Sequence, residues 1–115
     1  MTKATAVVAG SFLLLVNLLE VSIAAEQQFS CNGQIIEPSG EQKSPVDLGF
    51  SFGGNGKVSL KMTGDKALAS RMVSNNKIQL KFETKEFIGE FFHYTGDLFL
   101  IYRSGHLARL SCSHV

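Results

Sequence analysis

The chain has 115 residues, of which 44% are hydrophobic and 18% charged, and its formal net charge is only +1 at pH 7. This length is enough for one domain, but not for two domains with separate cores. The charge balance is even and there is no Lys/Arg-rich block or stripe, which argues against a nucleic-acid partner.

The amino-terminal residues have the pattern of a secretory signal peptide. Lys3 is the only charge before the long apolar run over residues 4–19, and the small residues of 22–25 follow that run. A basic start, an apolar run and a small-residue site together predict cleavage by signal peptidase. The expected cut lies after Ala24 or Ala25.

A permanent membrane anchor is the alternative to cleavage. It would need about 20 consecutive apolar residues, whereas Asn17 and Glu20 interrupt this run. We therefore expect residues 1–25 to be a helical signal peptide that is removed. Residues 26–115 then form a periplasmic or secreted domain with no membrane contact.

The remaining sequence consists of short segments that alternate between apolar and polar residues. Residues 57–62, for example, place Val58, Leu60 and Met62 on one face, as in a half-buried antiparallel strand. The predicted strands cover residues 28–36, 46–52, 57–62, 67–73, 77–83, 86–94, 97–103 and 106–112. This spacing predicts an all-β fold, either a small antiparallel barrel or a compact sandwich.

Turn-forming residues separate these segments and include Asn32-Gly33, which predicts a turn there. Residues 37–45, which contain the only two prolines, Pro38 and Pro45, are expected to form a polar loop. A helical turn over residues 67–72 is the one alternative to an all-strand structure.

The hairpin over residues 87–102 carries large apolar side chains on both faces. Phe91 and His93 lie on one predicted face, and Tyr94 on the other. The favoured interpretation is a central hairpin that is buried on both faces. The alternative is an exposed aromatic patch, with Phe91, His93 and Tyr94 as candidate contacts for a protein or a small apolar ligand.

Cys31 and Cys112 are the only cysteines and lie near the two ends of the mature domain. In an oxidising compartment such a pair predicts a disulfide. Closing a loop of this length stabilises the fold by about 4.5 kcal/mol in the chain-entropy account.

No pattern of catalytic or metal-binding residues stands out. His93, His106 and His114 show neither HxH nor HExxH spacing, and no G-x-S-x-G elbow accompanies the serines. We therefore expect no metal and no cofactor, and a non-enzymatic protein. A small hydrolase is the third and weakest hypothesis.

The layout resembles that of small periplasmic proteins of rhizobia and related α-proteobacteria, a group without an established activity. The resemblance is carried by the two bracketing cysteines and by Thr95-Gly96 with Gly89 upstream. Where an arginine is usual in that group, this chain has His93 or Tyr94. The resemblance implies an exported β domain whose two cysteines lie near its ends.

A second resemblance is to the periplasmic inhibitors of c-type lysozyme, which are small exported β-barrels bridged between the first and last strands. In those proteins a Ser-Gly-x-x-Tyr loop and a basic residue enter the lysozyme cleft. Residues 70–77 of this chain lie in a comparable place and contain Ser70, Arg71 and Lys77, without the glycine and the tyrosine.

The leading hypothesis from the sequence is an exported, monomeric, non-enzymatic binding module. The alternative is an inhibitor of a lysozyme-type hydrolase that acts through residues 70–77.

Overall fold

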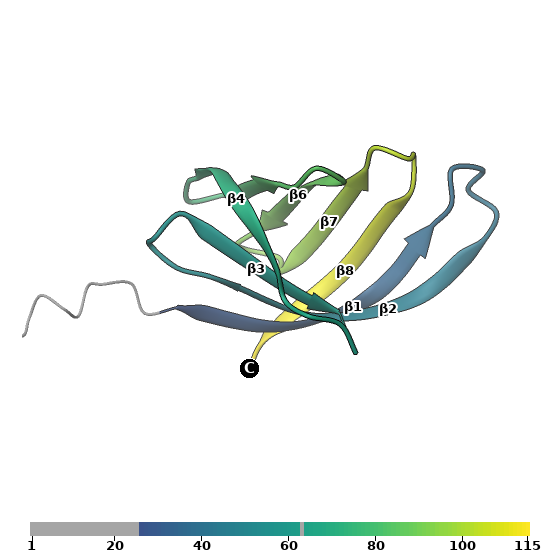
Figure 1. Ribbon diagram of the computed structural model, residues 1–115. Coiled ribbons are helices and arrows are strands. Elements are labelled where there is room, and N and C mark those ends of the chain that lie inside the picture. The colour runs from purple at the N-terminus through teal and green to yellow at the C-terminus, as the bar shows by residue number, and fades with distance from the viewer. Residues whose placement is uncertain (1–25, 63) are drawn as a thin grey trace, which may run out of the picture.

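The computed structural model describes residues 26–62 and 64–115 and shows a closed barrel of eight antiparallel strands in chain order (Figure 1). The predicted signal peptide, residues 1–25, lies outside the described residues. The strands are β1 (Gln27–Ile36), β2 (Lys43–Phe52), β3 (Lys57–Met62), β4 (Leu68–Asn75), β5 (Gln79–Glu83), β6 (Phe87–Phe92), β7 (Asp97–Tyr102) and β8 (Leu107–His114). Within these described ranges no helix is long and apolar enough to span a membrane.

The all-β prediction is confirmed, and the barrel is realised in place of the sandwich. All eight predicted strands occur, each within three residues of its expected ends. The helical alternative at residues 67–72 is wrong, because β4 runs through that segment and pairs with β3 and β5.

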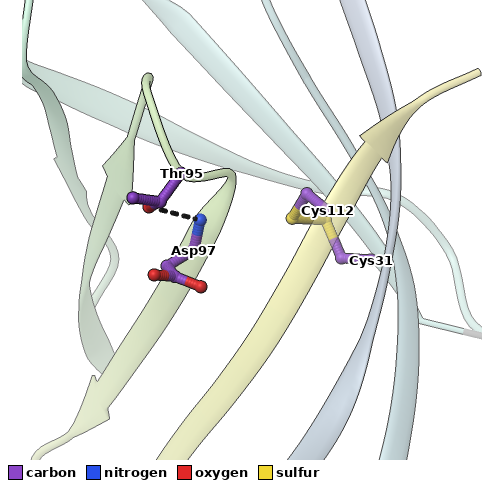
Figure 2. Close-up of a disulfide and its surroundings, with 4 residues drawn as sticks. All are labelled: Cys31, Thr95, Asp97 and Cys112. Carbon is purple, nitrogen blue, oxygen red and sulfur yellow. Dashed lines mark hydrogen bonds between the residues drawn. A yellow bond between two sulfur atoms is a disulfide. The ribbon is translucent and has the colours of Figure 1, made fainter.

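Pairing of the first and last strands closes the barrel, and the predicted disulfide lies in this seam. Cys31 is directly opposite Cys112, with their Cα atoms 4.0 Å apart. The Val115 amide donates a hydrogen bond to the Gln28 carbonyl, so the alternation of an antiparallel ladder makes Cys31 and Cys112 a non-hydrogen-bonded pair. Such pairs bring side chains closest together. Figure 2 shows the bridge between β1 and β8.

The prediction of a turn at Asn32-Gly33 is wrong, because both residues lie inside β1. Gly33 is opposite Leu110 in the seam. A Cβ atom at position 33 would lie 1.8 Å from the Arg109 carbonyl oxygen. Glycine is therefore needed here for the close approach of β1 to β8, and not for a change of chain direction.

Phenylalanine rings fill the barrel interior. Six of the eight phenylalanines among the described residues are buried, namely Phe29, Phe50, Phe52, Phe82, Phe87 and Phe91. Phe29, Phe50 and Phe91 form a mutually contacting group with ring centroids 5.0 to 5.8 Å apart. As is usual for eight-stranded barrels, side chains occupy the interior.

The prediction that the 87–102 hairpin is buried on both faces is wrong. Phe87 and Phe91 point inward and are 2% exposed, whereas Ile88 and Phe92 lie on the outer face and are only half-buried. Among residues 26–62 and 64–115 no second layer covers the outside of the barrel, so the side chains of this face remain at the surface.

The polar loop predicted for residues 37–45 is shorter than expected, because β2 begins at Lys43 and includes Pro45. The Glu37 amide donates a hydrogen bond to the Gln42 carbonyl. Hydrogen-bonded and non-hydrogen-bonded pairs alternate along an antiparallel ladder, so the nitrogen of Pro45 points away from β1. On the side of β2 that faces β3, the pairing ends at Leu48 and does not reach Pro45. Pro45 therefore lies on an open strand edge, where a missing N–H removes no ladder hydrogen bond.

Candidate functional site

An aromatic and aliphatic surface covers the outer side of the barrel around the β6–β7 turn. Four side chains from β6, β7 and the two neighbouring turns build it, and we call them the aromatic face: Ile78, Phe92, Tyr94 and Phe99. Tyr94 is 80% exposed and Ile78 is 61% exposed. With Thr95 and Asp97 they line a shallow hollow of about 350 Å³.

The β4–β5 turn holds Ile78 at one end of the aromatic face. The side-chain oxygen Oδ1 of Asn76 accepts hydrogen bonds from the amides of Ile78 and Gln79, both at 2.9 Å. This is the local bonding that favours asparagine in tight turns. The Ile78 carbonyl then accepts from the His93 amide at 3.0 Å, which joins this turn to the end of β6.

The β6–β7 turn holds Tyr94 and is attached to the disulfide strand. Gly96 has a φ of 79°, and its carbonyl accepts a hydrogen bond from the Cys112 amide at 2.8 Å. The Thr95 hydroxyl accepts from the Asp97 amide at 3.2 Å, as Figure 2 shows beside the bridge. The turn is thus fixed both internally and to β8.

Aromatic contacts order the centre of the face. The rings of Phe92 and Phe99 meet edge to face, 5.9 Å apart, a favourable arrangement for aromatic pairs. The Arg109 guanidinium lies 5.8 Å from the centre of the Phe99 ring, within the range of cation–π attraction. Lys81 and Glu90 form an ion pair at 4.0 Å on the adjoining strands β5 and β6.

The sequence-predicted residues of segment 70–77 do not form a projecting loop. β4 extends to Asn75, so most of the segment is strand. Ser70 is buried and its hydroxyl donates to the Val58 carbonyl at 3.1 Å. Arg71 is exposed and ion-paired with Glu83. Lys77 lies exposed in the β4–β5 turn.

The three candidates in the hairpin do not share one surface. Phe91 is in the core, 2% exposed. His93, just after β6, packs edge-on against Phe91 with ring centroids 5.5 Å apart, and its Nε2 is hydrogen-bonded to Asn75 Oδ1 at 2.8 Å. Of the three, only Tyr94 belongs to the aromatic face.

The other titratable side chains are dispersed. His106 lies between β7 and β8 and bonds to the Ser104 hydroxyl. His114 lies in β8, with its ring 4.4 Å from that of Phe29. Among the described residues no group of three or more His, Cys, Asp or Glu side chains could hold a metal ion.

Burial raises the pKa of Tyr102, which lies at the end of β7 away from the aromatic face. Tyr102 is partly buried against Phe87, at 5.1 Å between ring centroids. Desolvation, and in second place the negative charge of Glu86, raise the pKa of Tyr102 above its usual 10.0. A neutral phenol is therefore favoured in the folded protein.

Comparison with known proteins gives no match to a family model, a curated protein or a solved structure. The aromatic face is therefore characterised by its own geometry. Sequence reasoning missed Ile78, Phe92, Phe99 and Arg109 as site residues. Strand parity could have found Phe92 and Phe99, because each alternates with core residues on its own strand.

Proposed function

We propose that this chain is an exported, non-enzymatic binding module that recognises a protein partner through the aromatic face. The observation that carries the proposal is the placement of Ile78, Phe92, Tyr94 and Phe99 on one outer surface while the barrel interior has its own full set of aromatic side chains. Export to the periplasm or the exterior is part of the proposal.

The composition of the face favours a protein partner. Interface centres are enriched in tyrosine, phenylalanine and arginine, and the strongest contacts come from such side chains in a fixed position. Tyr94 and Phe99 are held by a turn and a strand, and Arg109 lies against Phe99. Little backbone entropy is then lost on binding.

Export is supported by the formed Cys31–Cys112 disulfide, which is consistent with an oxidising compartment. The inhibitor hypothesis stays a prediction. Of its three residues, only Arg71 and Lys77 are exposed for contact with an enzyme. Residual c-type lysozyme activity in the presence of the purified mature domain tests that hypothesis separately.

Site-specific photo-crosslinking in the expressing cell tests the proposed function. A photoreactive phenylalanine analogue replaces Tyr94 in the full chain, and the control carries it in place of Lys61, an exposed residue of β3 on the opposite wall. We expect one protein to be crosslinked from position 94 and not from position 61.

The crosslinked protein is then purified and titrated against the mature domain. We expect saturable binding that Phe99→Ala weakens by about tenfold or more, the size of a typical interface hot spot. Identical crosslinks from positions 61 and 94, or binding that is insensitive to Phe99→Ala, would show that the aromatic face is not the recognition surface.

A further inference from the structure

The barrel wall has a gap between β4 and β5, at the opposite end of these strands from the turn that holds Ile78. The β4–β5 ladder ends with the pair Arg71 and Glu83. Beyond this pair, β4 continues to Leu68 with β3 as its only described neighbour, while the chain of β5 turns away through residues 84–86. A β-bulge between Met72 and Ser74 shifts the register of β4, and bulges bend the strand that contains them.

A pocket of about 700 Å³ fills this gap, which we call the wall pocket. Its size is within the range of sites for small organic ligands. Leu68 pairs with the core residue Leu60 and so belongs to the inward face, yet it is 42% exposed. Leu68 gives the pocket an apolar floor, and Ala69 lines it from the outward face of β4. The Ser70 hydroxyl is already bonded to the Val58 carbonyl.

Charged side chains surround this floor unevenly. Arg71 and Glu83 neutralise each other. Lys57 approaches from β3 and Lys85 from the β5–β6 turn, and neither forms an ion pair with another residue in the described part of the chain. Glu86 also lines the pocket. Apart from the Arg71–Glu83 pair, the rim therefore offers two ammonium groups and one carboxylate beside an apolar surface.

We infer that the wall pocket binds a single-chain amphipathic anion of the fatty-acid class. The hydrocarbon chain would cover Leu68 and Ala69, and the carboxylate would lie between Lys57 and Lys85. Burial of apolar surface supplies most of the affinity, and the two lysines select an anionic head group. The wall pocket shares no residue with the aromatic face, so this inference is independent of the proposed function.

Calorimetric titration of the mature domain with dodecanoate below its micellar concentration tests the inference. Dodecanol is the uncharged control ligand, and acetate is the control without a chain. We expect saturable binding of one dodecanoate per domain. Binding of dodecanol should be about tenfold weaker, since each exposed charge contact contributes modestly, and acetate should not bind.

Variants assign the site. Leu68→Ser and the pair Lys57→Gln with Lys85→Gln should each weaken dodecanoate binding by about tenfold, while Lys61→Gln, an exposed lysine of β3 outside the pocket, should leave it unchanged. Circular dichroism checks that every variant is folded. Absence of saturable binding, equal affinity for dodecanol, or full affinity in the lysine pair would each overturn the inference.

Discussion

Phe91 and Phe92 are neighbours in sequence and have opposite roles. Phe91 contacts Phe29 and Phe50 at 5.0 Å inside the barrel, whereas Phe92 packs on Phe99 at the outer surface. The alternation of a β-strand separates them. One step along the chain therefore separates a residue that stabilises the fold from one that is available to a partner.

This difference predicts unequal effects of truncation. Phe91→Ala should lower the free energy of unfolding by about 3–5 kcal/mol, because it leaves a cavity in a packed core. Phe92→Ala should cost about 1 kcal/mol or less, as for a cross-strand pair at a surface. Urea unfolding of both variants measures the two values. Similar losses in the two variants would mean that the outer face is covered.

Tyr102 gives a pH-dependent prediction. Its pKa in the fold is raised above the usual 10.0, so the unfolded chain ionises first as the pH rises. Below pH 10 the neutral phenol makes its full contribution to the free energy of unfolding. This contribution is lost as the pH rises through the pKa that Tyr102 has in the folded protein. The free energy of unfolding should therefore fall more steeply above pH 10 in the wild type than in Tyr102→Phe.

Urea titrations over this pH range, with ultraviolet absorbance to follow the phenolate, measure the effect. Because the Glu86 charge is the second cause of the shift, Glu86→Gln should lower the pKa of Tyr102 towards its usual value. An identical pH profile in wild type and Tyr102→Phe would contradict the burial of this ring.

The strands could be predicted well from sequence, because alternation with period two is a local signal. Residues 57–62 show it without interruption, and β3 has these bounds. The role of Gly33 is set by its cross-strand partner Leu110, which is remote in sequence. From the local sequence alone, Gly33 is expected to lie in a turn. Likewise, Pro45 lies in a strand because the pairing with β3 ends at Leu48. Local patterns do not contain these long-range contacts.

The open edge of β2 gives an element-scale prediction. Prolines on edge strands prevent pairing with a second chain. Pro45→Thr restores an outward N–H and a good strand former at this edge, so we expect increased self-association at high protein concentration. Sedimentation velocity compares this variant with Ser44→Thr, whose backbone groups face β1. Equal monomer content in the two variants would indicate that Pro45 does not protect the edge.

At the scale of the whole molecule, the seam between β1 and β8 connects the stability of the barrel with the aromatic face. The Cys31–Cys112 bridge joins β1 to β8, and the Cys112 amide also holds the turn that carries Tyr94. The aromatic face was only partly predictable, because the sequence could not show that the described strands form a single layer with an uncovered outer side. The signal peptide and the periplasmic or secreted location stay predictions.

Intact mass spectrometry of the protein recovered from cells that express the full chain tests the central claim, an exported domain closed by its disulfide. The expected species is outside the cytoplasm, begins at Ala25 or Glu26, and gains the mass of two hydrogen atoms on reduction. A full-length cytoplasmic species whose two cysteines are both alkylated without prior reduction would contradict the claim.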